Sequence, residues 1–387
     1  MENFVFHNPV KIIFGKGEIA GLAKEIPENK KVMMLYGGGS IKKNFVYDAV
    51  KDALKNRDWT EFGGIEPNPK YETLMQAVEI VKSENVDFLL AVGGGSVIDG
   101  VKFVAAASVY QGNDPWDMLS KGAKVKNALP TGTVLTLPAT GSEMNSTAVI
   151  SRNSTKEKLP LSHPRLYPQF SVLDPEVVYS LPKKQVQNGI VDAFVHVIEQ
   201  YLTYSVNAEV QDRWAEGLLM ALMNTGPEIL SDQQNYEHAA NLMWEANNAL
   251  NGILRCGVPE DWSTHMIGHE ITALHAVDHA ETLAMVLPGV MQEMRKEKSE
   301  KLLQYAGRVM GIRDDIPEGK RIDKVIDKTE DFFKSMGMKT RLSDHDIDMD
   351  TIGEIEKRFI RRPGFDALGE RENLSPLRVR QILANRL

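Results

Sequence analysis

The sequence predicts an α/β protein with two domains, a parallel sheet followed by a bundle of helices. In the first half, short apolar runs end in glycine-rich turns and alternate with helical patterns. After about residue 180, apolar residues recur at helical spacing and candidate strands become few. Aspartate and histidine side chains also gather in this second half. We therefore expect an α/β domain over residues 1–180 and an all-helical domain over residues 181–387.

Three apolar runs in the first half predict neighbouring strands of the sheet. The runs, each with the turn that follows it, are 31–36 with GGGS at 37–40, 86–92 with GGGS at 93–96, and 133–137 with PATGSE at 138–143. Each run is continuously apolar, which is typical of parallel strands covered by helices on both faces. Their turns fall at strand carboxyl ends, where open α/β sheets bind ligands.

The first residues of the chain carry a different pattern. Residues 4–15 alternate between apolar and polar on either side of Asn8-Pro9. This alternation predicts two strands, and the proline places them at a sheet edge. The segment is either an ordinary first hairpin or an arm that pairs with another subunit, and the second interpretation predicts a homodimer.

The two GGGS turns are neither a Rossmann GxGxxG nor a Walker A loop, yet they favour a phosphate-bearing cofactor. Glycines allow a phosphate to approach backbone N–H groups, and the helix that follows offers its positive end. Together with Thr140 in the third turn, they predict a cofactor site at one edge of the sheet. Asp99, three residues after Ser96, either orients its turn or meets a ribose hydroxyl; the alternative is a first-turn carboxylate favoured by the helix dipole.

The second half carries a candidate divalent-metal site. Asp192 and His196 are four residues apart, which puts both on one helix face. His265 and His279 belong to a segment, 265–279, that holds four of the nine histidines. Three imidazoles and one carboxylate suit Zn²⁺ or Fe²⁺ better than Ca²⁺ or Mg²⁺. Each histidine by itself is more typical of a satisfied surface or interface residue, and it is the density of the cluster that favours a metal site.

These ligands can meet only if the chain turns back between His265 and His279. On one unbroken helix the two would lie roughly 21 Å apart. Asp278 followed by Glu281 predicts a capping box that opens a new helix with His279 in its first turn. We therefore expect a fold-back over residues 274–277.

Composition excludes several classes of protein. The net charge of −8, without a long Lys/Arg cluster, argues against a nucleic-acid partner. No apolar stretch approaches a membrane span, and the N-terminus does not resemble a signal peptide. The one cysteine, Cys256, cannot form an internal disulfide and is expected to be buried. We expect a cytoplasmic protein.

The motifs together resemble the iron-containing (group III) alcohol dehydrogenases from about residue 4 to near the C-terminus, and are most similar to the bacterial NADPH-dependent aldehyde reductase and butanol dehydrogenase branch. The segments that carry the resemblance are GGGSVID at 93–99, LPATGSE at 137–143, GIVDAFVH at 189–196 and the histidine segment 262–279. GGGS at 37–40, FGGIEPNP at 62–69 and NDPWD at 113–117 resemble that branch.

The resemblance implies a role for each matching residue. The metal ligands would be Asp192, His196, His265 and His279, with His269 near the ion as a proton relay. The cofactor would be lined by Gly38, Gly39, Ser40, Gly94, Gly95, Ser96, Thr136, Thr140 and Lys158. The family fold places the active site in the cleft between an α/β domain and a helical domain. Members named for iron can also hold zinc, so the ion stays open between Fe²⁺ and Zn²⁺.

One departure from the family concerns the cofactor. Members that use NAD often carry an aspartate just after the first strand, where it grips the adenosine ribose. This chain has Gly37 to Ser40 there, with Lys42 and Lys43 close behind. Without that carboxylate a 2′-phosphate meets no repulsion, and Ser40 can donate a hydrogen bond to it, so we expect NADP(H).

The prediction is therefore a metal-dependent NADP(H) oxidoreductase that reduces small aldehydes to primary alcohols. The alternatives are an NAD-using lyase of the dehydroquinate synthase type, a polyol dehydrogenase, or a non-catalytic metal- or nucleotide-binding module. A lyase acting on an acidic substrate would need several Arg or Lys side chains around the metal. The candidate ligands are instead flanked by Phe194, Trp262 and Met266.

Overall fold

The computed structural model describes residues 1–362 and 367–387, and these form two compact units. The sheet unit consists of His7–Pro182 and Asp232–Asn251, and the helical unit of Met1–Phe6, Lys183–Ser231 and Gly252–Leu387. The predicted fold class, a parallel-sheet domain followed by a helical domain, is confirmed. Residues 1–6 belong to the helical unit and residues 232–251 to the sheet unit, so neither unit is one continuous stretch of chain. The domain bounds 1–180 and 181–387 stay a prediction.

The sheet unit is built on a six-stranded sheet in the order β1-β8-β5-β4-β2-β3, and every neighbouring pair is parallel. The strands are β1 (Lys11–Phe14), β2 (Val32–Tyr36), β3 (Trp59–Phe62), β4 (Phe88–Gly93), β5 (Thr131–Leu135) and β8 (Phe170–Leu173). Tyr36 pairs with Val92, and Gly93 with Leu135. The carboxyl ends of β2, β4 and β5 are thus aligned, so their turns follow at one edge of the sheet.

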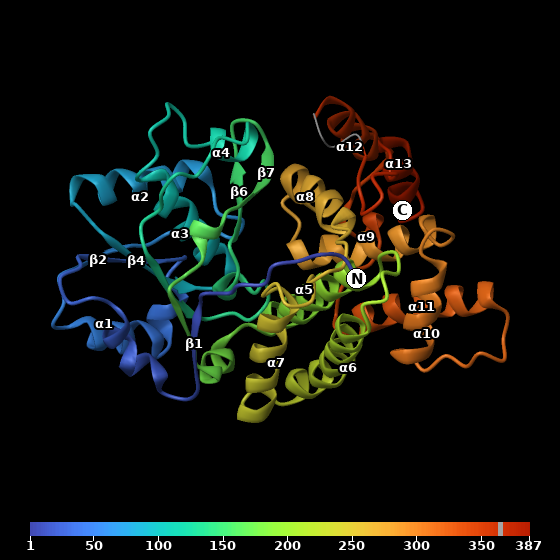
Figure 1. The fold of residues 1–387 in the computed structure, drawn as a ribbon, viewed down its shortest axis with the longest axis horizontal. Coiled ribbons are helices and arrows are strands. Elements are labelled where there is room, and N and C mark those ends of the chain that lie inside the picture. The colour runs from blue at the N-terminus through green and yellow to red at the C-terminus, as the bar shows by residue number, and fades with distance from the viewer. Residues whose placement is uncertain (363–366) are drawn as a thin grey trace. The chain divides into compact units, whose positions relative to one another are not determined.

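Helices flank this sheet because its central strands are buried along their whole length. The helices of this unit are α1 (Val46–Leu54), α2 (Tyr71–Ser83), α3 (Gly95–Ala107), α4 (Asp117–Ser120) and α7 (Tyr236–Ala249). Figure 1 shows α2 and α3 on one side of the sheet and α1 on the other. An antiparallel hairpin of β6 (Thr147–Arg152) and β7 (Glu157–Ser162) is added beside α3.

The prediction of two strands in residues 4–15 is half wrong. Only β1 forms, at the sheet edge as expected, and residues 1–10 are in no strand. Phe4, Val5 and Phe6 are exposed instead, Val5 to 95%. An isolated alternating segment gains nothing from an extended conformation until a second strand supplies its backbone hydrogen bonds. The main chain is held at Glu2, whose N–H donates to Gly257 O at 2.9 Å.

The helical unit contains the second half of the chain apart from α7. Its helices are α5 (Lys183–Tyr201), α6 (Glu209–Ser231), α8 (Ser263–His275), α9 (His279–Glu293), α10 (Ser299–Arg308), α11 (Glu318–Ser335), α12 (Met349–Arg361) and α13 (Pro376–Ala384). Short 3-10 helices connect elements in both units, at Glu18–Glu25, Ser40–Lys43, Ser142–Met144, Pro164–Leu166, Pro175–Ser180 and Leu342–His345. Among the described residues, no helix is both long and apolar enough to span a membrane.

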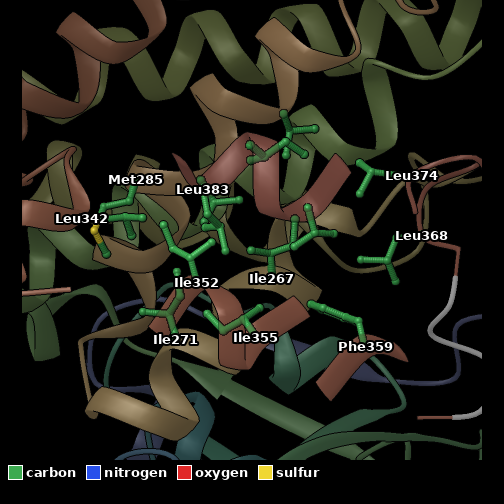
Figure 2. Close-up of a cluster of buried hydrophobic side chains, with 14 of the residues drawn as sticks. Ile267, Ile271, Met285, Leu342, Ile352, Ile355, Phe359, Leu368, Leu374 and Leu383 are labelled. Carbon is green, nitrogen blue, oxygen red and sulfur yellow. The ribbon is translucent and has the colours of Figure 1, made fainter. Parts of the chain in front are cut away.

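A shared apolar core fixes α8 and α9 against the C-terminal helices (Figure 2). Ile267 and Ile271 of α8 and Met285 of α9 are completely buried in it, together with Ile352 and Ile355 of α12. Burial of each such side chain stabilises the fold by roughly 1.5–3 kcal/mol. The two helices that carry the predicted histidine ligands are therefore held by packing on the side away from those histidines.

Candidate metal centre and nucleotide-binding turns

Helix α5 presents Asp192 and His196 on one face of the helical unit. The residues are one turn apart, so their side chains project to the same side. Both are 4% exposed, and Asp192 Oδ1 lies 3.7 Å from His196 Nε2. A buried carboxylate beside a buried imidazole is costly unless a cation or a hydrogen bond compensates it.

A reversal of the chain brings the other two predicted ligands to the same place. Helix α8 ends at His275, Ala276 adopts a left-handed conformation with φ 56°, and α9 begins at His279. The predicted fold-back and the predicted helix start are confirmed. Because a left-handed residue ends the helix, the chain changes direction within three residues.

The predicted capping box at the start of α9 is wrong. Asp278 occupies the N-cap position but makes no side-chain cap bond. It accepts from Asn188 Nδ2 at 3.3 Å, and Glu281 pairs with Lys184. Both carboxylates are therefore engaged with α5, and these contacts tie the start of α9 to the helix that carries Asp192.

Helix α8 is divided between a polar and an apolar face. His265 and His269 are four residues apart and lie on one face, whereas Ile267 and Ile271 are offset by two residues, about 200° around the helix. The isoleucines enter the apolar core of Figure 2. The histidines are directed toward α5 and α9, since the His265 ring lies 4.6 Å from that of His196 and 5.2 Å from that of His279.

One carboxylate oxygen lies at the centre of the cluster. Asp192 Oδ1 is 3.7 Å from His196 Nε2, 3.8 Å from His265 Nε2 and 3.7 Å from His279 Nε2. The donor atoms of Asp192, His265 and His279 all lie within 4.8 Å of one another. An ion held at about 2.0–2.1 Å keeps tetrahedral donors about 3.3 Å apart. Small inward movements of these side chains would therefore complete such a site.

The donor set fits a borderline divalent ion. Nε2 of His265 is buried and has no hydrogen-bond partner among the described residues, so it can bind an ion once the ring has lost its extra proton. Three imidazoles and a carboxylate match Zn²⁺ or Fe²⁺. These four residues would hold the ion.

The protonation of two histidines depends strongly on their surroundings. Burial lowers the pKa of His196 to about 4, which Asp192 only partly opposes. Burial acts in the same direction on His265, but the Glu199 and Asp192 carboxylates outweigh it and raise its pKa to about 9. An ion at the centre would take the place of the proton that Asp192 and Glu199 attract to His265.

His269 lies beside the predicted ligands. Its ring is 5.2 Å from that of His279 and 6.2 Å from that of His265, measured between centroids, and the residue is buried. His275, by contrast, is exposed and its Nε2 lies 3.1 Å from Thr351 Oγ1. Of the two histidines of α8 that were not predicted as ligands, His269 therefore lies beside the cluster and His275 does not.

One buried residue at this centre was not predicted from the sequence. Glu199, one turn beyond His196 on α5, contacts His265 Nδ1 with Oε2. Its Oε1 accepts from the backbone N–H of Thr264 at 2.6 Å and of His265 at 3.3 Å. The only available signal was its position seven residues after Asp192, which places it on the same helix face.

In the sheet unit, the second GGGS turn packs directly against the third turn. A Cβ on Gly95 would lie 2.3 Å from Thr140 Oγ1, and one on Gly94 would lie 3.0 Å from Leu137 Cβ. Thr136 N donates to Gly93 O at 3.0 Å. Glycine is required here by close approach, and the start of a helix such as α3 favours an anion.

Asp99 joins these two turns and caps no helix end. Its Oδ1 accepts from Ser142 Oγ at 2.5 Å and its Oδ2 from Val149 N at 2.9 Å. Buried Lys102 donates to the same Ser142 hydroxyl at 2.8 Å and to Asn145 Oδ1 at 3.1 Å. Burial lowers the pKa of Lys102 to about 8, although Asp99 and Glu143 oppose the shift. The contacts favour the interpretation of Asp99 as the residue that orients a turn.

Lys158 reaches the same edge from β7. Its Nζ donates to Asn68 Oδ1 at 2.9 Å, and Asn68 N donates to Ser96 Oγ at 3.3 Å. Lys158 is buried. The sheet unit thus brings a lysine close to the second GGGS turn, as a site for a phosphate-bearing molecule requires.

The first GGGS turn has room for a ligand or a side chain. A Cβ on Gly38 or Gly39 would meet nothing within 4 Å, although Gly39 has φ 90°. Lys42, which the sequence placed near a 2′-phosphate, lies 3.3 Å from Glu61 Oε1 and over the Tyr36 and Tyr47 rings. Its charge is therefore already partly neutralised.

A parallel sheet with glycine turns at its strand ends, combined with a buried carboxylate–imidazole cluster, is typical of metal-dependent enzymes that bind a nucleotide cofactor. Comparison with known proteins is more specific. The chain belongs to the iron-containing alcohol dehydrogenase family: residues 9–175 match its iron-containing alcohol dehydrogenase domain and residues 186–382 its C-terminal domain.

Several relatives and structures are similar over almost the whole chain. The NADPH-dependent aldehyde reductase YqhD of Escherichia coli is 52% identical over 97% of each chain. A probable NADH-dependent butanol dehydrogenase of Bacillus subtilis is 43% identical over 92% of this chain and 93% of its own. The structure of NADH-dependent butanol dehydrogenase A from Thermotoga maritima matches with a TM-score of 0.95 and 38% identity, covering 100% of this chain and 99% of that one. The chain is therefore an oxidoreductase, as predicted, and the lyase alternative gains no support.

Proposed function

We propose that this protein is an NADP(H)-dependent reductase of small aldehydes, which works in reverse as a primary alcohol dehydrogenase. The observation that carries the proposal is Asp192 Oδ1 lying 3.7–3.8 Å from three imidazole nitrogens in a chain of this family. The E. coli relative named as an NADPH-dependent aldehyde reductase supports the substrate class and the cofactor. The butanol dehydrogenase relatives support a small primary alcohol as the product.

Each part of the site would have a distinct role in the reaction. Asp192, His196, His265 and His279 would hold one Fe²⁺ or Zn²⁺, which supplies Lewis-acid stabilisation of the developing alkoxide. The turns at 37–40 and 94–96, with Thr136, Thr140 and Lys158, would hold the phosphates and ribose of the cofactor. Asp99 would hold the second GGGS turn to the turn at 138–143. The His269 imidazole would transfer the proton that completes the alcohol.

The test is consumption of NADPH with butanal by protein stripped of metal and then given Zn²⁺ or Fe²⁺. We expect turnover that depends on both the aldehyde and the ion. Metal analysis of protein purified without added metal would identify the native ion. Absence of turnover with either ion, across short straight-chain aldehydes, would contradict the proposed function.

The choice of cofactor gives a sharper prediction. NADPH should exceed NADH in kcat/KM, and Gly38→Asp should erode or reverse that preference, because a carboxylate there repels a 2′-phosphate and can accept from ribose hydroxyls. The structure allows this change, since nothing lies within 4 Å of a Cβ on Gly38. Gly38→Asn is the matched control, similar in size but without the charge. A wild-type enzyme that prefers NADH would contradict the argument from the turn.

A homodimer is the proposed assembly, joined through the N-terminal arm, residues 1–8. Phe4, Val5 and Phe6 expose three consecutive apolar side chains in a segment that forms no strand. Val5→Asp should therefore shift the mass measured by light scattering toward the monomer, and deletion of residues 1–6 should do the same while leaving Asn8 in place. Leu377→Asp, at a 58% exposed position of α13, is the control. An unchanged mass in both arm variants would reduce the segment to an ordinary terminus.

We also propose a cytoplasmic location. Cys256 is the one cysteine of the chain and is buried and free, as expected. Burial raises the pKa of its thiol, which keeps it in the unreactive protonated form. A protein without disulfides needs no oxidising compartment.

A further inference from the structure

We propose that Glu199 is a positioning residue for the metal centre, which sets the His265 ring so that Nε2 faces the ion. This inference rests on the proposed metal site and deepens it. The juxtaposition that carries it is one carboxylate shared between an imidazole nitrogen and two backbone N–H groups of the same short segment. Glu199 itself does not touch the ion in this arrangement.

The first step of the argument concerns the ring. Glu199 Oε2 contacts His265 Nδ1, while Nε2 of the same ring is 3.8 Å from Asp192 Oδ1. A carboxylate can only accept, so Nδ1 carries the hydrogen and donates it. In the neutral imidazole that leaves the lone pair on Nε2, which is the nitrogen directed at the other donors.

The second step concerns the helix that carries the ring. The N-cap position of α8 is Trp262, which has φ 60° and provides no side-chain cap. Glu199 Oε1 serves instead, since it accepts from the first-turn N–H groups of Thr264 and His265. The negative charge also lies at the positive end of the helix dipole. One side chain of α5 therefore fixes both the start of α8 and the orientation of its histidine.

Helix α5 thus provides more than two ligands. Asp192, His196 and Glu199 follow at intervals of four and three residues and share one helix face. The Glu199 backbone contributes too, because its carbonyl accepts from Asp261 N at 2.9 Å. Two donors and the group that orients a third come from a single rigid element, which limits how far the site can spread when the ion leaves.

Glu199→Gln separates positioning from simple packing. A carboxylate accepts with both oxygens, whereas an amide accepts with one and donates with the other group. If the Gln oxygen keeps the two backbone bonds, its NH₂ faces Nδ1 and favours the ring form with the hydrogen on Nε2. That form has no lone pair on Nε2 and cannot bind an ion there, so the substitution weakens metal binding.

The experiment is Zn²⁺ affinity by chelator competition in metal-free wild type, Glu199→Gln and Glu216→Gln. Glu216 is the matched control, a buried carboxylate of α6 that accepts from Tyr201 Oη at 2.9 Å. We expect a ten- to hundredfold weaker Kd for Glu199→Gln and an unchanged Kd for Glu216→Gln. The Tm of metal-free Glu199→Gln should fall near neutral pH, because the carboxylate that stabilises protonated His265 is lost, and its Co²⁺ absorption spectrum should differ from that of wild type.

Two outcomes distinguish the layers of the proposal. A wild type that binds Zn²⁺ while Glu199→Gln binds it equally tightly, with the same Co²⁺ spectrum, overturns the positioning role and leaves the proposed function standing. A wild type that takes up no ion overturns the proposed function, and this inference with it.

Discussion

Alanine at His265 or His279 should abolish metal binding and essentially all turnover, whereas His269→Ala should keep its ion and lose about a hundredfold in rate. The first two rings direct Nε2 atoms to within 3.8 Å of Asp192 Oδ1. His269 lies against the His279 ring instead, and the other four residues already provide a complete set of protein ligands. Metal content by mass spectrometry and steady-state rates on the three variants are the measurements.

His275→Ala is the internal control for that series. It is a histidine of the same helix, but it is exposed and contacts Thr351 of α12 rather than the cluster. Metal content and rate should both stay near wild type. A metal-free His269→Ala together with a metal-loaded His279→Ala would refute the ligand assignment.

Lys298→Met should lower the free energy of unfolding by about 3–5 kcal/mol. Lys298 Nζ lies 2.6 Å from Asp261 Oδ2 and 2.8 Å from Glu370 Oε2, and it donates to Leu202 O at 2.6 Å. All three charged side chains are at most 5% exposed. Methionine keeps the volume but leaves two buried carboxylates without their cation. Urea unfolding of metal-free protein, followed by circular dichroism, measures the loss.

Lys334→Met is the control for that substitution. Its side chain is 54% exposed, and its partner Glu330 also accepts from Arg386 and Thr340. The expected change is below about 1 kcal/mol. A Lys298→Met protein that unfolds at the wild-type urea midpoint would mean that solvent reaches Asp261 and Glu370.

The sequence predicted those parts of the fold that depend on local pattern. Continuous apolar runs located β2, β4 and β5, and helical spacing located α5 to α10. Strands β3 and β8 were missed because four residues carry too little periodicity to distinguish a strand from a loop. The predicted strand at residues 4–7 failed for a different reason, since its pattern has no partner strand within the described chain to pair with.

The site likewise divides into residues that spacing along the sequence can predict and residues whose roles depend on contacts between distant parts of the chain. Spacing and a resemblance to the family selected Asp192, His196, His265 and His279, and the structure brings their side chains together. Glu199 could not be found in this way, because its partners lie 65 and 66 residues further on and a glutamate on a helix is ordinary. The capping box failed because α5 attracts both of its carboxylates. Tertiary contacts outweighed the local motif.

The distribution of the donor atoms also links metal supply to the lifetime of the protein. Asp192 and His279 lie 87 residues apart in the sequence, so no short fragment of an unfolded chain can assemble the site. An ion that binds only the native state stabilises it by mass action, by about 2.7 kcal/mol when free metal exceeds Kd a hundredfold. The sheet unit contributes no donor to this cluster. A cell short of the ion would therefore hold less stable molecules, and faster proteolysis would lower the amount of enzyme in addition to the loss of catalysis.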